Sequence, residues 1–408
     1  MADRLTQGLM SYEDALAGIL DTPVRTATES VPLAQAENRV LGADIVTLLD
    51  QPPNSVSAMD GYAVLAADLA SRDSVLDLVG SIAAGDPPGA KIAIRQTMRI
   101  LTGAPMPEGA DAVAIQENAT GTGDGRVRIE GSVDPGRYVR PAAYDFKRNV
   151  VIAQKSHTLS TAGLALAAAA GHADLTVMRR PRVGIISTGN ELVPPGTRPE
   201  AGQIIASNAV GVSALLRRFG ADPIDLGIAR DTMDALSTLI TKAQGLDLDL
   251  LITLGGASVG DHDLVRPALE QHGAVMNFWK VAVRPGKPLM HGQLGPMALI
   301  GLPGNPVSSL VCSHIFVWPL IKKLLAQETD LPRMVAKLAT DLPANGPRRH
   351  FMRARLAGSD AGVNLVTPLE DQDSSLLSRL AYCDMLVDVP PHNPAMKAGQ
   401  MCQTIALL

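Results

Sequence analysis

Aromatic side chains, cysteines and clustered positive charge are all scarce in this sequence of 408 residues. Aromatic residues make up only 3%, the formal net charge is -5, and no segment concentrates Lys and Arg. Nucleic-acid-binding proteins usually have a basic face or aromatic side chains for base stacking, so we expect no nucleic-acid partner. The three cysteines, Cys312, Cys383 and Cys402, form no C-x-x-C pair, which predicts buried thiols in a reducing compartment rather than a zinc site.

Long hydrophobic runs are also scarce. The longest apolar stretch, residues 162–171, is mostly alanine and falls short of the roughly 18 residues that a membrane span needs. The first ten residues include Asp3 and Arg4 and lack the apolar core of a signal peptide. We therefore expect a cytoplasmic protein without a membrane partner.

The residues that are abundant predict a globular protein of several domains. Hydrophobic residues make up 46% and charged residues 19%, and domains of roughly 100–200 residues would divide the chain into a few parts. Residues 11–45 show the pattern of two helical pieces, with Ser11 placed to cap the first. From residue 46 onward, short β-type runs alternate with Gly and Pro, and Gly123-Asp124-Gly125 predicts a hairpin. A helix is expected at residues 160–170, with Gly171 as its stop.

A regular alternation of strand and helix patterns begins at Pro181. Fully apolar strands alternating with helices are typical of a parallel sheet covered on both faces. Beyond Leu331 the runs become short and β-like again, which favours a small barrel or sandwich. The strands are expected at residues 183–186, 223–229, 249–254 and 297–302, and the helices at residues 207–219, 231–244 and 307–325.

One glycine-rich turn of this region, residues 255–263, follows a buried strand at the sheet edge where α/β proteins bind ligands. Its glycines let the backbone approach a phosphate, but Asp261 and His262 replace the Lys and Ser/Thr of a Walker loop. Carboxylates after the glycines fit a metal-assisted phosphate site. A tight turn with a helix-capping Asp fits the same residues equally well.

Three further loops carry hydroxyls, carboxylates and cations. Residues 187–191, Ser-Thr-Gly-Asn-Glu, follow another buried strand. Arg284 and Lys287 lie in a loop stiffened by prolines, which suits bidentate and point-charge contacts with oxyanions. Residues 301–306, Gly-Leu-Pro-Gly-Asn-Pro, present Asn305 near a helix start, where backbone amides attract anions. Each loop alone is also compatible with a plain turn, a rigid connector or solvated surface cations.

Together the four loops predict a highly anionic, phosphate-bearing ligand and a divalent cation, because we expect them to share one edge of the sheet. In the β insert, residues 57–63 and 102–105 form two further polar motifs around Asp60. An Asp followed by Gly is more often a turn former than a functional group. The residue types alone name neither the ligand nor the metal.

The ordered set of motifs resembles the MoeA family, which includes the E domain of gephyrin and its plant counterpart. The similarity extends over nearly the whole chain, and the set is specific although no single motif is. The resembling segments are residues 57–63, 101–104 with 109–113, 187–192, 202–204 with 207–208, 255–263, 285–288 and 301–306.

The resemblance implies an α/β multidomain fold with four parts. An elongated, α-containing first domain would comprise residues 8–45 and 145–180, interrupted by a mostly β insert domain at residues 46–144. A molybdopterin-binding α/β/α domain with a largely parallel sheet would span residues 181–328. A C-terminal β-barrel domain would span residues 329–408.

The resemblance also implies an activity, that of a molybdopterin molybdotransferase. Adenylylated molybdopterin and molybdate would give molybdenum cofactor and AMP, with Mg²⁺ as the metal. The protein would be a homodimer whose active-site cleft combines the β domain of one subunit with the α/β domain of the other. The expected transfer partners are the adenylyltransferase that supplies the substrate and the molybdoenzymes that receive the cofactor.

Matching positions carry candidate functional residues over to this chain. The catalytic candidates are Asp60, Thr102, Glu191, Asp231, Asp263, Arg284 and Lys287, and Glu191, Asp231 and Asp263 are also the candidate metal ligands. The candidate cofactor-binding residues are Ser187, Thr188, Gly255, Gly256, Ser258, Gly260, Pro303, Gly304, Asn305, Arg353 and Ser375, with Ser374 as the alternative to Ser375.

The chain departs from the family at three places. Asn190 stands where the family often has Asp, Arg284 where it usually has Lys, and Ala143-Tyr144-Asp145 where it commonly has Gly-Glu-Asp. Two other functions stay open: a molybdopterin adenylyltransferase, whose domain resembles residues 181–328, and a non-catalytic carrier of the finished cofactor. The extra β domains argue against the first, and the departure at Tyr144 motivates the second.

Overall fold

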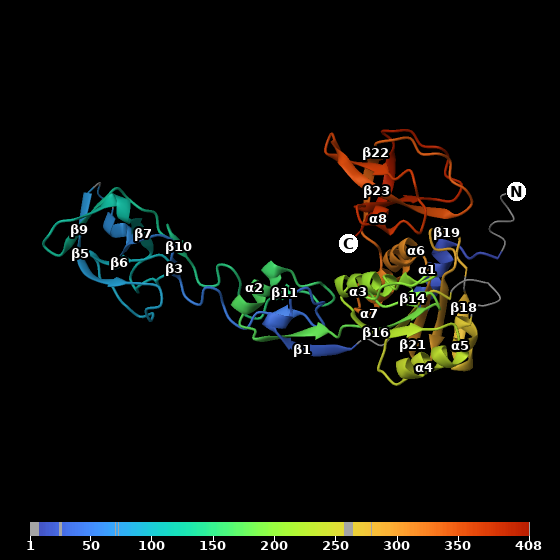
Figure 1. The fold of residues 1–408 in the computed structure, drawn as a ribbon. Coiled ribbons are helices and arrows are strands. Elements are labelled where there is room, and N and C mark those ends of the chain that lie inside the picture. Colours follow the sequence, from blue (N-terminus) through green and yellow to red (C-terminus); the bar gives the residue numbers. More distant parts are fainter. Residues whose placement is uncertain are drawn as a thin grey trace. The chain divides into compact units, whose positions relative to one another are not determined.

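The computed structural model describes residues 8–23, 27–69, 71, 73–256, 264–278 and 280–407. The chain forms two compact units, one made of residues 1–29 with 178–408 and the other of residues 30–177 (Figure 1). The first unit contains the α/β sheet and the C-terminal barrel, and the second contains the β insert.

The α/β part of the first unit is built on a six-stranded sheet. Its strands are β13 (Arg182–Thr188), β16 (Asp222–Ala229), β17 (Leu250–Leu254), β18 (Ala274–Phe278), β20 (Met290–Leu294) and β21 (Met297–Leu302). They lie in the order β16-β13-β17-β21-β20-β18. The first four pair in parallel, whereas β20 and β18 pair antiparallel at one edge. The predicted largely parallel sheet is therefore confirmed, and the two antiparallel strands are an addition to it.

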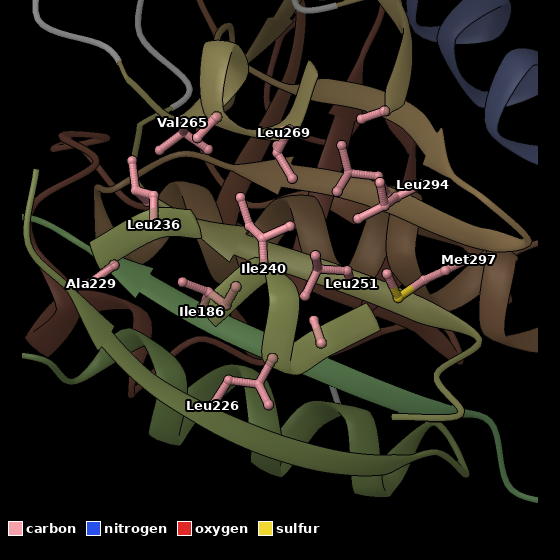
Figure 2. Close-up of a cluster of buried hydrophobic side chains, with 14 of the residues drawn as sticks. Ile186, Leu226, Ala229, Leu236, Ile240, Leu251, Val265, Leu269, Leu294 and Met297 are labelled. Atoms are coloured by element: carbon pink, nitrogen blue, oxygen red, sulfur yellow. The ribbon is translucent and has the colours of Figure 1, made fainter. Parts of the chain in front are cut away.

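Helices cover both faces of this sheet. They are α3 (Asn208–Arg218), α4 (Met233–Gln244), α5 (Val265–Gln271), α6 (Pro306–Cys312) and α7 (Trp318–Leu324). The chain moves outward from β13 to β16 through α3 and returns past β13 to β17 through α4. Because such crossovers are right-handed, opposite directions place α3 and α4 on opposite faces. Figure 2 shows Leu236 and Ile240 of α4 packed over Ile186 and Leu251 of the sheet.

The longest apolar helix lies after β21. α6, a π-helical turn at Ser313–Val317 and α7 form a continuous stretch, Pro306–Leu324, which is long and apolar enough to cross a membrane. In its most apolar window, however, 78% is buried inside the protein. Gly211 of α3 approaches Leu310 so closely that an added Cβ would lie 3.0 Å from its side chain. The stretch therefore packs as a core helix, and it is longer than the apolar run at residues 162–171.

A six-stranded sheet follows the α/β part, and five of its strands close into a barrel. It contains β19 (Val283–Arg284), β22 (Arg333–Leu338), β23 (Arg349–Asp360), β24 (Val363–Pro368), β25 (Met385–Val389) and β26 (Met401–Ala406), with α8 (Leu377–Leu380) between β24 and β25. The strand order is β19-β23-β24-β22-β26-β25, and an additional pairing between β23 and β25 closes the sheet. The predicted C-terminal β-barrel is confirmed.

The N-terminal helix α1 (Tyr12–Asp21) packs within the first unit. The Ser11 hydroxyl accepts a hydrogen bond from the Asp14 N–H at 3.0 Å, so the predicted cap is confirmed. The ring of Tyr12 lies 5.4 Å from that of Phe316 and 5.2 Å from that of Phe351. α1 therefore joins the α/β part to the barrel, and the predicted boundaries of the first domain stay a prediction.

The second unit has a six-stranded sheet in the order β7-β4-β6-β5-β9-β8 and shorter two-stranded pairs. The hairpin predicted at residues 123–125 joins β8 to β9. The helix predicted after Ser160 is confirmed, and Gly171 follows it with φ +97°. The elements are β1 (Thr28–Pro32), β2 (Ile45–Val46), β3 (Val56–Ser57), β4 (Gly61–Val64), β5 (Asp73–Ile82), β6 (Gln96–Ile100), β7 (Ala112–Ile115), β8 (Ala119–Gly121), β9 (Arg126–Glu130), β10 (Val139–Arg140), β11 (Val151–Ala153), α2 (Thr161–Ala169) and β12 (Asp174–Met178), with 3₁₀ turns at Leu33–Gln35, Ala66–Leu69 and Gln116–Asn118.

The prediction of a second helical piece before residue 45 is wrong. This segment contains β1, which pairs with β12, and β2, which pairs with β11. Both partners lie more than a hundred residues further along the chain, as the pair Val46 and Val151 illustrates. A local residue pattern carries no information about such partners, and tertiary pairing overrides weak helical propensity.

Candidate active site

Three turns at the carboxyl ends of neighbouring parallel strands meet at one edge of the α/β sheet. β17 lies between β13 and β21, and its last residue, Leu254, is level with Ser187 on one side and Leu302 on the other. The segments that follow these strands therefore start side by side. This places residues 189–191, 255–256 and 303–305 around one space, as expected for ligand sites of parallel sheets.

The fourth predicted loop is arranged differently. Val283 and Arg284 form β19, which pairs with β23 of the barrel rather than with a strand of the α/β sheet. The expectation that all four loops follow buried strands of one sheet is therefore wrong for this loop. Its prolines and cations predict a rigid, charged loop. They do not indicate which strand the loop pairs with.

Gly255 fixes how closely the turn after β17 approaches β13. Its φ is +93°, a conformation that residues with a Cβ rarely adopt. A Cβ added there would lie 2.8 Å from the carbonyl oxygen of Thr188 and 2.9 Å from its hydroxyl oxygen. A Cβ on Gly304 would in turn touch the Cα of Gly255 at 3.6 Å. The three turns therefore meet through backbone contacts that leave no room for side chains at Gly255.

A reciprocal pair of hydrogen bonds joins the turn after β13 to the segment after β16. The Asn190 N–H donates to the Asp231 carboxylate at 3.2 Å, and the Asp231 N–H donates to the Asn190 side-chain oxygen at 3.1 Å. An Asp at position 190 would place two carboxylates together, so the neutral amide of Asn190 removes a repulsion. Gly189, with φ +149°, leaves space for the Glu191 carboxylate to fold back over the turn.

A cavity of about 710 Å³ opens over these turns, within the range of small-molecule sites. Ser187 and Thr188 are buried in its floor, whereas Glu191 and Asp231 are exposed at its wall. The cavity thus combines hydroxyls, backbone amides and carboxylates. Of the predicted residues, those that line it are Ser187, Thr188, Glu191, Asp231, Gly255, Gly256, Pro303, Gly304, Asn305 and Ser375.

The barrel closes one side of this cavity. The Asn305 side-chain amide donates to the Ser374 hydroxyl at 2.8 Å, and the Val307 N–H donates to the Ser374 carbonyl at 3.2 Å. Ser375 and Leu377 then complete the wall. One amide of the first turn of α6 is therefore satisfied by the barrel, whereas the sequence suggested that the helix start serves an anion.

Arg353 is buried beneath this wall, with 1% of its surface exposed, and it does not line the cavity. Its guanidinium donates to the Asp373 carbonyl at 2.9 Å and the Asp371 carbonyl at 3.2 Å. The Asp373 carboxylate accepts hydrogen bonds from the N–H and hydroxyl of Ser375. Burial lowers the pKa of Arg353. Arg353 therefore positions the segment that presents Ser374 and Ser375.

The remaining candidates of the first unit lie elsewhere or outside the described residues. Arg284 lines a separate cavity of about 450 Å³ together with His350 and Glu370. Lys287 is exposed next to Pro288, which does line the larger cavity. Ser258, Gly260 and Asp263 fall in the segment 257–263, which lies outside the described residues.

Asp60 and Thr102 form a pair in the second unit. Gly61 of β4 lies opposite Ile100 of β6, so the residues next to these strand ends face each other. The N–H and the hydroxyl of Thr102 both donate to the same Asp60 carboxylate oxygen at 2.7 Å. These two hydrogen bonds hold the pKa of the Asp60 carboxyl below its usual range, and the one from the backbone N–H contributes most. Asp60 is therefore an exposed, ionised carboxylate of fixed orientation.

Sequence reasoning missed one residue that shapes the cavity. The Asn208 side-chain amide donates to the Gly304 carbonyl at 2.6 Å, and Ser207 and Asn208 both line the cavity. The short parallel pair of β14 (Leu192–Val193) and β15 (Ile204–Ile205) brings this segment to the turn after β13. Residues 202–204 with 207–208 were among the family-like segments, which was the signal that could have identified Asn208.

Gly255→Ala is expected to destabilise the first unit more than Gly399→Ala. Both glycines have positive φ, so both substitutions cost about 1–2 kcal/mol of backbone strain. Only the Cβ at position 255 meets neighbouring atoms, because nothing lies within 4 Å at Gly399. Urea unfolding followed by tryptophan fluorescence measures both. Equal losses of stability in the two variants would show that the close approach to Thr188 is unimportant.

Thr102→Val is expected to raise the pKa of Asp60 without restoring its usual value, because the hydroxyl donor is lost and the backbone N–H remains. As the pH falls, any activity that needs ionised Asp60 should then be lost at a higher pH in Thr102→Val than in the unchanged protein. Carboxyl-carbon NMR titration measures the shift. Asp341, whose pKa is lowered by Lys397 and the Ala398 N–H, is the internal control. An unchanged Asp60 titration would refute the role of the hydroxyl.

Comparisons with known proteins cover nearly the whole chain. Residues 10–171 match the MoeA N-terminal region (domain I and II), residues 184–323 a probable molybdopterin binding domain, and residues 335–407 the MoeA C-terminal region (domain IV).

Relatives match over nearly their full lengths. A molybdopterin molybdenumtransferase of Haemophilus influenzae is 34% identical, with 96% of this chain and 97% of the relative covered. A molybdopterin molybdenumtransferase of Bacillus subtilis is 34% identical, with 93% of this chain and 90% of the relative covered. The crystal structure of a molybdopterin biosynthesis MoeA protein from Pyrococcus horikosii is 30% identical, with a TM-score of 0.84 over 98% of this chain and 99% of that one. With its strand-end cavity and its barrel, the chain belongs to the MoeA family.

Proposed function

We propose that the chain is a molybdopterin molybdotransferase, which inserts molybdate into adenylylated molybdopterin, forms the molybdenum cofactor and releases AMP. The observation that carries the proposal is the cavity at the ends of β13, β17 and β21, which combines hydroxyls, glycine amides and carboxylates. Relatives that match nearly the full chain have the same activity in their names. The volume of about 710 Å³ suits a ligand of nucleotide size.

The floor of the cavity is proposed to bind the phosphate end of the pterin substrate. Glycine backbones approach phosphates closely and offer N–H donors, and the buried Ser187 and Thr188 hydroxyls add further hydrogen-bonding groups. The proposed binding residues are Ser187, Thr188, Gly255, Gly256, Ser258, Gly260, Pro303, Gly304, Asn305 and Ser375, with Arg353 positioning Ser375.

Cleavage of a phosphoanhydride needs positioning and charge stabilisation more than a protein nucleophile. Arg284 and Lys287 are proposed to neutralise oxyanion charge, including that of the molybdate dianion. Thr102 holds Asp60 ionised and oriented, and Asp60 is proposed to act on the substrate from the second unit. No covalent enzyme intermediate is needed in this scheme.

The carboxylates at the cavity wall fit a magnesium ion. Magnesium takes oxygen ligands, keeps several waters, and is usually held by one or two carboxylates together with substrate phosphates. Glu191 and Asp231 both line the cavity, and the described residues contain no cluster of three or more His, Cys, Asp or Glu side chains suited to a metal. We propose Glu191, Asp231 and Asp263 as the ligands. A magnesium ion there would offset the negative charge of the phosphates.

We also propose a homodimer, which the resemblance to the MoeA family implies. One subunit would supply its β domain and the other its α/β domain. The adenylyltransferase and the recipient molybdoenzymes are the proposed transfer partners. A cytoplasmic location is proposed as well, and free Cys312, Cys383 and Cys402 are compatible with it.

Purified protein is expected to release AMP from adenylylated molybdopterin and magnesium only when molybdate is present. Asp231→Asn should lower this rate roughly a hundredfold, because it removes charge at the site while keeping the side chain's shape. Asp60→Ala and Asp263→Ala should abolish it. Chromatography of released AMP measures all three.

Asp222→Asn is the matched control, because Asp222 begins the strand β16 that Asp231 follows. Its rate should equal that of the unchanged protein. Cofactor binding without AMP release would refute the transferase and leave a carrier. Adenylylation of molybdopterin from ATP would instead indicate the adenylyltransferase.

Mixing the Asp60→Ala and Asp231→Asn proteins by joint unfolding and refolding is expected to restore activity. In a composite site, half of the dimers would be mixed and each would carry one intact site, giving about a quarter of the original rate. Light scattering would verify that dimers formed. Dimers without any regained activity would show that each subunit builds its site alone.

A further inference from the structure

The second unit has its own cavity, of about 640 Å³, beside the position where this chain departs from its family. We propose that it binds a planar amino-substituted heterocycle carrying a phosphate, with the ring stacked on Tyr144. The identity of the ligand rests on the proposed function, since its substrate contains two such rings, an adenine and a pterin. The existence of the site rests on the geometry of the cavity.

Tyr144 is an exposed aromatic side chain on a fixed backbone. Its side chain is 67% exposed, whereas Phe146, two residues further on, is buried with only 7% of its surface exposed. The Ala143 N–H donates to the Pro52 carbonyl at 2.8 Å, and the Asp145 N–H donates to the Gln51 carbonyl at 2.9 Å. Both neighbours of Tyr144 are therefore tied to the segment on the opposite side. A tyrosine held in this way offers a stacking surface at a small cost in conformational entropy.

The backbone at Ala143 is strained to keep this arrangement. Its φ of +59° lies in the left-handed region, which a residue with a Cβ adopts only where its surroundings enforce it. The family commonly has Gly here, so this chain keeps the conformation without the residue that adopts it freely. The retained conformation fixes the backbone beside the exposed ring, which is consistent with the proposed binding role.

The walls around Tyr144 combine flat apolar surfaces with charge. Pro52, Pro88 and Pro105 supply rigid rings, and such surfaces suit the faces of a heterocycle. Arg140 lines the same cavity and suits a phosphate, because its guanidinium makes bidentate contacts with oxyanions. Asp145 supplies carboxylate oxygens that accept hydrogen bonds from ring amino groups. One cavity thus offers contacts for both the ring and the phosphate of the same ligand.

The cavity also shares a loop with the proposed reactive carboxylate. Gly103 and Pro105 line it, while Thr102 of the same loop holds Asp60. The Gly103 N–H donates to the Ser57 carbonyl at 2.9 Å, which fixes the loop against β3. A ligand stacked on Tyr144 therefore shares with Asp60 the loop that holds the Asp60 carboxylate. Tyr144 then acts as a residue that binds substrate rather than one that performs chemistry.

Fluorine NMR of the full chain labelled with 3-fluorotyrosine tests the site directly. The chain has five tyrosines, and Tyr144→Phe identifies the Tyr144 signal by its loss. AMP, adenosine and pterin-6-carboxylate are titrated separately, and at least one should shift that signal. The Tyr382 signal is the control, because Tyr382 is equally exposed at 70% but lies in the barrel. AMP or the pterin as the stronger ligand identifies which ring the site takes.

Arg140→Gln separates ring from phosphate binding. For AMP it should weaken binding at the Tyr144 signal at least tenfold, whereas adenosine should bind as before. If AMP is not a ligand, the same loss is expected for the carboxylate of pterin-6-carboxylate. No shift of the Tyr144 signal with any of the three probes overturns the proposal. If Arg140→Gln binds AMP or pterin-6-carboxylate as tightly as the unchanged protein does, the role of Arg140 is overturned.

Steady-state kinetics test the use of the site in turnover. Tyr144→Ala should raise the KM for adenylylated molybdopterin at least tenfold and leave kcat within twofold, as for a group that binds ground state and transition state alike. Tyr144→Glu, the family's residue, should also raise KM, Tyr144→Phe should not, and Tyr382→Ala should behave as the unchanged protein. An unchanged KM in Tyr144→Ala contradicts the proposal. Absence of activity in the unchanged protein refutes the transferase instead, and the NMR titration still decides the site.

Discussion

The parallel pairing of β13, β17 and β21 is the constraint on which the strand-end cavity depends. With Leu254 level with both Ser187 and Leu302, three turns begin at the same edge, and their backbones must share a narrow space. Gly255 resolves that crowding because it tolerates φ +93° and has no Cβ to strike Thr188. The glycines of this edge thus serve packing, and the Gly255 N–H is itself used in it, donating to the Leu302 carbonyl at 3.1 Å.

The cavity is completed by the barrel rather than by the α/β sheet alone. The Arg353 guanidinium donates hydrogen bonds to the carbonyls of the segment after β24. That segment presents Ser374 to Asn305. A buried cation used in this way is stabilised because its Nε and both terminal nitrogens donate to carbonyl oxygens. An arginine that family resemblance places at the ligand therefore acts from beneath the wall, and its influence on a ligand passes through Ser374 and Ser375.

Two departures from the family have distinct physical meanings. Asn190 accepts the Asp231 N–H as an Asp would, but it brings no second carboxylate beside Asp231. Tyr144 changes the chemistry of its position, because a flat apolar ring replaces a charged side chain at a cavity that contains Arg140. The first change preserves the local structure, whereas the second alters what the cavity can bind.

The sequence by itself determined the buried strands, the cap at Ser11, the helix ending before Gly171, and the glycine turns, because periodicity, capping and positive φ are local properties. Much of the candidate site followed, since the ends of parallel strands must meet at one edge. Only the tertiary structure decided that β1 and β2 are strands, that β19 joins the barrel, and that Arg353 lies beneath the cavity rather than in it. Each of these depends on partners distant along the chain, and a local pattern contains no record of such partners.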